Sequence, residues 1–239
     1  MAREPHLDPD VLAMTGKTPP ARVRAKLWDG PTRIVHWLIV VLLAVSWVTA
    51  ETGVMSLHRW SGYFVLGLVV FRLYWGFAGS QSARFASFIK GPRTTLAYVR
   101  SIAGRTSSEV AGHNPLGAWS VLALLGMLAA QVGFGLFAVD VDGLESGPFS
   151  YLVEFDVGRT AARLHHLTFV ALQMLVALHL AALAFYFIHK RQNLIGAMIT
   201  GRRHFEADPQ LTFAPAWRAV AGLVAAAMLV WLVSHGFRF

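Results

Sequence analysis

The sequence contains no cysteine and has little charge. Only 14% of its 239 residues are charged, and its 13 carboxylates are outnumbered by 21 lysine and arginine residues. Without cysteine, the chain has no disulfides, no thiolate-held iron–sulfur or zinc site, and no covalent attachment point for a haem. Any metal that this chain holds must therefore be bound through nitrogen or oxygen.

Long apolar runs are what the sequence does have. Hydrophobic residues make up 55% of the chain, and uninterrupted apolar stretches of about 17 to 25 residues are long enough to cross a bilayer. We therefore expect an all-α membrane protein, with a four-helix transmembrane bundle and a fifth, C-terminal transmembrane helix. The expected spans are residues 34–50, 58–78, 116–139, 164–188 and 217–234.

The spans divide the chain into a core and polar segments. The N-terminal arm has no apolar stretch long enough for the core of a signal peptide, and we expect it to be basic and flexible. In the second connection, Pro92 followed by Leu96, Val99 and Ile102 predicts a short helix on the membrane surface. The expected divisions are a basic arm (1–33), the four-span core (34–188), a basic connection (189–215), and the fifth span with a short tail (216–239).

The charges of the connections predict the orientation. Lysine and arginine gather in the arm and in the second and fourth connections, whereas the third connection, 140–163, has five carboxylates and two arginines. Basic connections stay on the cytoplasmic side, so we expect a cytoplasmic N-terminus and a periplasmic C-terminus. The net charge of +8 is explained by this topology, and we expect no nucleic-acid partner.

The fourth span is unusual because it is apolar and yet carries three histidines. At helical geometry, His165 and His179 lie about 21 Å apart along the axis and within about 40° of each other around it. In the expected topology His58 is level with His165 at the outer edge of the membrane, and His36 is level with His179 about 21 Å deeper. The histidines therefore form two layers of two.

Each layer can offer two opposed imidazoles to one metal centre. Two axial histidines are what a six-coordinate haem iron needs for electron transfer, because no position then remains for a substrate. A zinc or manganese site would need more ligands, and the spans contain essentially no carboxylate beyond Glu51. A single membrane histidine is more often a hydrogen-bonded packing residue, but the matched spacing of two pairs favours metal ligation.

Four arginines are candidate partners for haem propionates, because a guanidinium binds a carboxylate bidentately. Arg33 and Arg72 lie at the inner level, and Arg59 and Arg163 at the outer level. Arg59 and Arg163 are equally well explained as interfacial anchors.

Other residues near the layers have less specific interpretations. Gly62 lies one turn below His58, where a side chain would collide with a macrocycle, although helix packing alone also explains it. His166 is rotated by about 100° from His165 and is expected to be a neighbour of the outer haem. We expect the remaining histidines to be solvated, namely His6, His113, His189, His204 and His235.

Several of these stretches resemble a known family. RIVHW, HRWSGYF, FRLYWGF with Arg72, and LHHL followed by HLAAL are similar to the bacterial di-haem cytochrome b561 family and to the b-type cytochrome subunits of nickel–iron hydrogenases. ARFASFIKGP, GHNPLGAW and KRQNLIGAMITGRR extend the resemblance over about residues 28–204. It implies a four-helix bundle in the bacterial inner membrane with two non-covalent haems b, ligated by His36 with His179 and by His58 with His165. It implies no role for the fifth helix.

The expected function is transmembrane electron transfer. The resemblance implies a periplasmic redox partner, such as a c-type cytochrome or a dehydrogenase or hydrogenase subunit, and the membrane quinone pool or an inner acceptor on the other side. Whether the chain is itself a quinone-linked oxidoreductase stays open.

Two alternatives also stay open. One is a superoxide oxidase that passes electrons to quinone; a positive funnel of Arg59, Arg163 and His166 would suit the anion, but the acidic third connection argues against it. The other is a haem-free transporter. It is disfavoured by the missing carboxylates and by the absence of helix-breaking Gly/Pro pairs at matched positions.

Overall fold

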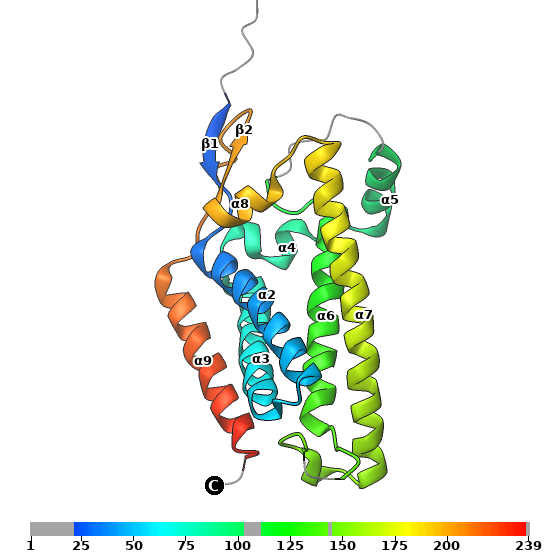
Figure 1. Ribbon diagram of the computed structural model, residues 1–239. Coiled ribbons are helices and arrows are strands. Elements are labelled where there is room, and N and C mark those ends of the chain that lie inside the picture. Colours follow the sequence, from blue (N-terminus) through cyan, green and yellow to red (C-terminus); the bar gives the residue numbers. More distant parts are fainter. Residues whose placement is uncertain (1–21, 103–110, 143–144, 238–239) are drawn as a thin grey trace, which may run out of the picture.

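The computed structural model describes residues 22–102, 111–142 and 145–237. Long helices dominate it, and those that are long and apolar enough to cross a membrane confirm the predicted all-α membrane fold (Figure 1). They are α2 (Gly30–Glu51), α3 (Met55–Ala78), α6 (Pro115–Phe137), α7 (Phe155–Ile188) and α9 (Ala216–Ser234).

Two of these helices, α2 and α7, begin the furthest ahead of their predicted spans. The side chain of Asp29 accepts a hydrogen bond from the backbone N–H of Thr32 at 2.8 Å, and this cap starts α2 at Gly30 instead of residue 34. Helix α7 starts at Phe155 instead of residue 164, with Asp156 in its first turn, where a negative charge is favourable. The last part of the acidic third connection is therefore helical.

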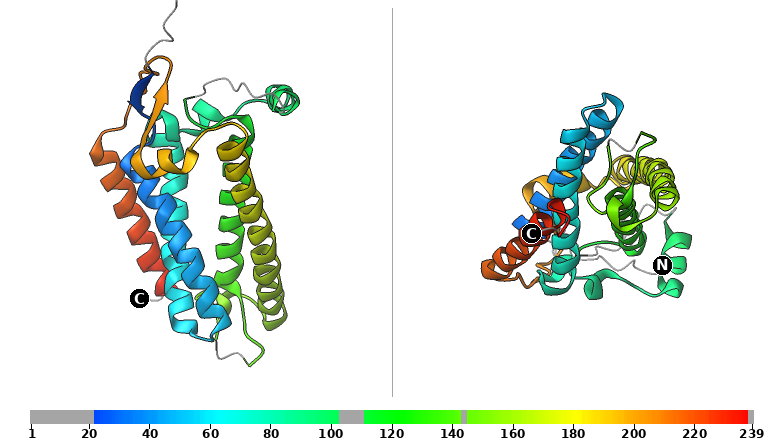
Figure 2. Two further views of the ribbon diagram at one scale, coloured as in Figure 1. Left: turned by 45° about the horizontal axis from the view of Figure 1, so that its top comes forward. Right: turned by 90° about the horizontal axis from the view of Figure 1, so that it is seen from below.

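The long helices pack as two pairs, and α9 packs on the outside of one pair. Helix α2 lies against α3, α6 lies against α7, and the two pairs meet mainly through α3 and α6. Helix α9 packs on the side of α3 that faces away from α6 and α7 (Figures 1 and 2). Gly222 permits this approach, because a Cβ there would lie 2.5 Å from the ring of Tyr74.

Short elements gather at one end of the bundle. Strand β1 (Val23–Lys26) pairs antiparallel with β2 (Arg202–Phe205), beside α8 (Leu194–Thr200). We call this the sheet end. Two further short helices, α4 (Phe85–Phe88) and α5 (Pro92–Ser101), lie near it (Figure 1), and α5 is the short helix predicted from the Pro92 pattern. The 3₁₀ helices are η1 (Gln81–Ala83) and η2 (Ser150–Leu152).

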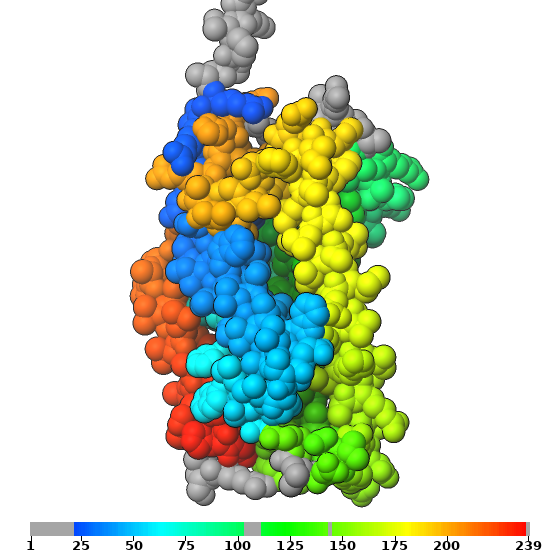
Figure 3. Space-filling model, viewed as in Figure 1, coloured from blue at the N-terminus to red at the C-terminus, as the bar shows by residue number. Residues whose placement is uncertain are grey.

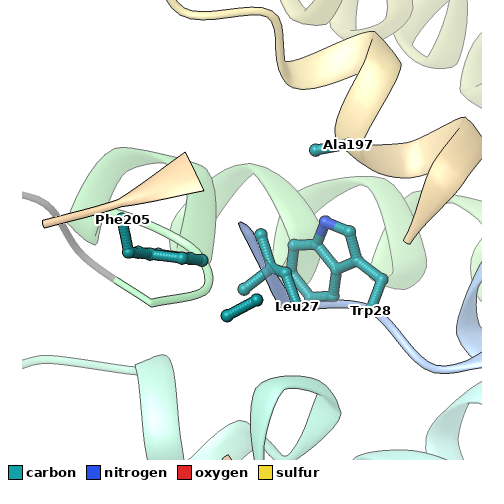
Figure 4. Close-up of a cluster of buried hydrophobic side chains, with 5 residues drawn as sticks. Leu27, Trp28, Ala197 and Phe205 are labelled. Carbon is teal, nitrogen blue, oxygen red and sulfur yellow. The ribbon is translucent and has the colours of Figure 1, made fainter. Parts of the chain in front are cut away.

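Part of the arm that was expected to be flexible is packed instead. Leu27 and Trp28 are buried with Ala25, Ala197 and Phe205 in one apolar cluster (Figure 4). The backbone N–H groups of Leu27 and Trp28 donate to the carbonyl oxygen of Gly201 at 2.8 and 3.1 Å. Burial of this apolar surface and the strand pairing hold residues 23–28 onto the bundle.

Candidate metal centre

His58 and His165 are neighbours at the end of the bundle opposite to the sheet. His58 stands in the first turns of α3 and His165 projects from α7, and their ring centroids are 6.0 Å apart with the ring planes at 85°. With metal–imidazole bonds of about 2 Å each, this separation leaves room for one metal ion between the rings. The structure therefore brings together the two histidines that were predicted to be level.

Both rings of this pair are oriented by main-chain carbonyl groups. His58 Nδ1 lies 2.8 Å from the carbonyl oxygen of Ser46, and His165 Nδ1 lies 2.8 Å from that of Gln131. A carbonyl oxygen only accepts, so Nδ1 carries a hydrogen in both rings, and in the neutral tautomer this leaves Nε2 as the nitrogen that can bind a metal. A metal-binding histidine usually donates such a hydrogen bond from the ring nitrogen that does not bind the metal.

Helix α6 is shaped to receive the ring of His165. A Cβ atom at Gly135 would lie 2.9 Å from His165 Cε1 and 3.0 Å from Nδ1, so only glycine leaves space for the imidazole there. The side-chain nitrogen of Gln131 lies 3.1 Å from His165 Nε2, and Thr168 donates to the side-chain oxygen of Gln131. Helices α6 and α7 therefore hold this imidazole from both sides.

His36 and His179 form the second predicted pair, nearer the sheet end. The two half-buried rings are close enough to interact electrostatically, His36 from α2 and His179 from α7. His36 Nδ1 is buried and has no hydrogen-bond partner among the described residues. An unpaired buried polar atom is costly, so this nitrogen marks a site built for a further group.

A buried apolar layer separates the two levels. Val65 and Val69 of α3 pack against Leu128 of α6 and Leu172 of α7, and each side chain is at most 4% exposed. Leu172 lies midway between His165 and His179 in the sequence. The structure therefore has two polar levels in an apolar bundle, as two separate redox centres would require.

Charged and aromatic residues surround the His36–His179 pair. Arg72 of α3 is buried, its Nη1 has no hydrogen-bond partner in the described part of the chain, and its guanidinium lies 5.2 Å from the Phe85 ring. His113 was expected to be solvated, and this was wrong: its ring lies between those of Trp28 and Phe88, at centroid distances of 4.8 and 4.7 Å. Folding of the arm and of α4 onto the bundle covers it.

His113 also interacts electrostatically with residues of the His36–His179 level. Burial, together with the nearby Arg72 guanidinium, lowers the pKa of His113 to about 3, and His179 and His36 contribute to the shift. The imidazole is therefore neutral at physiological pH. Its Nδ1 is buried without a partner among the described residues.

The other predicted site residues have varied surroundings. Arg33 donates to the carbonyl oxygens of Met198 and Ile199 at the end of α8, and Arg59 pairs with Glu145. Arg163 and His166 are exposed on α7. A Cβ at Gly62 would meet nothing within 4 Å, so there is open space beside the first turns of α3.

The remaining described histidines are all exposed. His189, His204 and His235 are exposed, as expected, and His6 lies outside the described residues.

Gln131 and Asp29 were not among the predicted site residues. Gln131 is the single amide side chain in the largely apolar helix α6, and this was a usable signal, because a membrane helix rarely carries an uncompensated polar group. Asp29 precedes Pro31 and Thr32 in a helix-start pattern that explains its capping role. Its second contact, with Trp75 of α3, depends on tertiary packing and has no local sequence signal.

The donor set fits a haem with two axial histidines. The rings of His58 and His165 are 6.0 Å apart with both Nδ1 atoms bonded to carbonyl oxygens, and His36 and His179, also from different helices, interact electrostatically. No group of three or more histidine or acidic side chains that could hold a metal ion occurs in the described ranges. The surface is hollowed between α2 and α7, with α6 visible at the bottom of the furrow (Figure 3).

Comparison with known proteins places the chain in a family. It is 27% identical to a probable Ni/Fe-hydrogenase 1 B-type cytochrome subunit of Escherichia coli K12, over 54% of this chain and 67% of that protein. It is 24% identical to a probable Ni/Fe-hydrogenase B-type cytochrome subunit of Bradyrhizobium diazoefficiens, over 82% of this chain and 94% of that protein. No solved structure matches the chain. The model of the prokaryotic cytochrome b561 family matches residues 27–201, so the chain belongs to this family of multi-pass membrane proteins that carry electrons by b-type haem.

Proposed function

We propose that the chain holds two haems b and carries electrons across the bacterial inner membrane by passing them from one haem to the other. His58 and His165 are the proposed axial ligands of one haem, and His36 and His179 of the other. The observation that carries the proposal is the close approach of the His58 and His165 rings at one level and the electrostatic interaction of His36 with His179 at the other, with a buried apolar layer between the levels. A bis-histidine haem supplies a one-electron centre whose iron has no free position for a substrate.

The polar residues around each level have proposed roles in holding the haem propionates. Arg72 is the best candidate at the His36–His179 level, because it is buried and its Nη1 has no partner among the described residues. Arg33 is a weaker candidate, since its guanidinium is engaged by the carbonyl groups of α8. At the other level Arg59, Arg163 and the exposed His166 are the candidates, and the space beside Gly62 is proposed to receive the macrocycle.

The proposed orientation has the sheet end in the cytoplasm and the C-terminus in the periplasm. The exposed side chains of Arg24, Lys26 and Arg202 on the two strands support it, because basic segments are retained on the cytoplasmic side. In this orientation the His58–His165 level lies near the periplasm and the His36–His179 level near the cytoplasm.

The relatives suggest the partners. Proteins similar to this chain are named as cytochrome subunits of nickel–iron hydrogenases, so we infer that the electron donor is a periplasmic redox subunit of hydrogenase or dehydrogenase type, or a c-type cytochrome. The quinone pool is the proposed acceptor.

The superoxide oxidase alternative has less support. Its anion funnel needs the charge of Arg59, but Arg59 is paired with Glu145. Arg163 and His166 are exposed on α7. We therefore favour electron transfer between proteins and the quinone pool.

The experiment is haem extraction and redox titration of the purified chain. Two haems b per chain and two redox steps are expected. His36→Ala and His58→Ala should each remove one step, and exposed His204→Ala serves as the matched control that keeps both. A count near zero overturns the proposal in favour of the transporter alternative, and a count near one means that one level is only a packing contact.

A further inference from the structure

Asp29 lies at a junction between two helices of the core. It is only 5% exposed, and it is the one buried carboxylate among the described residues. Its Oδ1 accepts from the backbone N–H of Thr32 at 2.8 Å, and its Oδ2 accepts from the indole N–H of Trp75 at 2.9 Å. One side chain therefore caps α2 and ties it to α3.

The same carboxylate acts electrostatically on a buried cation. Asp29 and Arg72 interact electrostatically, and Arg72 is only 7% exposed. Trp75, which Asp29 holds, lies one turn after Arg72 on α3. A buried arginine is costly unless an opposite charge compensates it, so Asp29 stabilises Arg72 where it stands.

Both charges lie at the sheet end of the core, the end nearer to the His36–His179 level. Arg72 acts electrostatically on His113, and His113 interacts in turn with His36 and His179. Asp29 precedes His36 by seven residues, about 10 Å along the axis of α2. The carboxylate therefore also fixes the start of the helix that presents His36.

We propose that Asp29 is a positioning residue that, with Arg72, sets the charge at the His36–His179 level and thereby the reduction potential of the centre bound there. The inference rests on the proposed haem at this level. Negative charge near the centre disfavours the reduced form, which has one less positive charge, and positive charge favours it. Asp29 lowers the potential and Arg72 raises it, and the buried pair keeps the two effects in balance.

The test is a redox titration of the purified haem-containing protein with four variants. Asp29→Asn keeps an N-cap side chain of the same shape but removes the charge, so the potential of the His36–His179 centre should rise. Arg72→Gln should lower it. The double variant should return toward the wild-type value, and Trp75→Phe, which removes the indole N–H without a change of charge, should leave the potential nearly unchanged.

The outcomes separate this inference from the proposed function. If wild-type protein lacks a second haem, the proposed function fails. If both haems are present but Asp29→Asn leaves both potentials unchanged, the inference is overturned. If Asp29→Asn and Trp75→Phe lower the reduction potential of this centre equally, Asp29 only packs the helices. The same conclusion follows if the potential of the double variant lies further from the wild-type value than that of either single variant.

Discussion

Gln131 contacts both ring nitrogens of His165. Its carbonyl oxygen lies 2.8 Å from Nδ1, and its side-chain nitrogen lies 3.1 Å from Nε2. The ring is thus held in one orientation by a single residue of the neighbouring helix. Because the main-chain contact involves only Nδ1, Nε2 can bind a metal once the amide side chain of Gln131 turns aside.

The first prediction separates the two adjacent histidines of α7. His165→Ala should remove the low-spin bis-histidine signal of one haem and leave the other intact, because His165 alone meets His58. His166 is exposed, so His166→Ala should keep both haems. Low-temperature paramagnetic resonance of the two variants is the measurement. Loss of a haem in His166→Ala with retention in His165→Ala would mean that α7 is rotated by about a quarter turn.

The second prediction concerns Gly135. Its replacement by alanine should lower haem occupancy at the His58–His165 level, because the new Cβ would stand 2.9 Å from a ring that its carbonyl partner prevents from moving away. Gly126→Ala is the matched control on the same helix, where a Cβ meets nothing within 4 Å. Haem content per chain and the two redox steps are measured. Equal occupancy in both variants would contradict the prediction.

The third prediction concerns the apolar layer. Leu172 is 2% exposed and packs between the two levels, so Leu172→Ala should destabilise the fold by about 2–4 kcal/mol through lost contacts and a cavity. Leu178 of the same helix is 66% exposed, and Leu178→Ala should cost well under 1 kcal/mol. Thermal unfolding of both variants in detergent is the test, and similar midpoints would argue against a packed layer.

The fourth prediction concerns acid stability. The folded-state pKa of His113 is about 3, below the ordinary histidine value of 6.5, so the unfolded chain binds more protons between these two pH values. The free energy of unfolding should therefore fall as the pH is lowered through this window. The fall should be smaller in His113→Phe than in the wild type. Unfolding midpoints at pH 7 and pH 5 provide the measurement, with exposed His204→Phe as control. An identical pH dependence in His113→Phe and wild type would refute the burial of His113.

The levels of the histidines followed from the sequence because the rise of a helix is fixed. His165 and His179 must stand about 21 Å apart wherever α7 lies, and the connection lengths then bring His58 and His36 beside them. Apolar run length similarly identified the membrane helices, although the cap at Asp29 moved the start of α2, and α7 begins at Phe155, ahead of its apolar run.

What the sequence did not predict depends on contacts between distant segments. The pairing of β1 with β2 joins Val23 to Phe205, and two four-residue polar strands have no periodic signal of their own. His113 is covered only because Trp28 and Phe88 fold over it from two other segments. The contact of Asp29 with Trp75 has the same origin.

The strand pairing also sets an order of assembly during synthesis. Val23 leaves the ribosome early, but its partner Phe205 is made only after the four core helices, a delay of roughly 10 s or more at 5–20 residues per second. Until then the cluster of Leu27, Trp28 and Phe205 cannot form, and the end of the bundle near His36 lacks its cover.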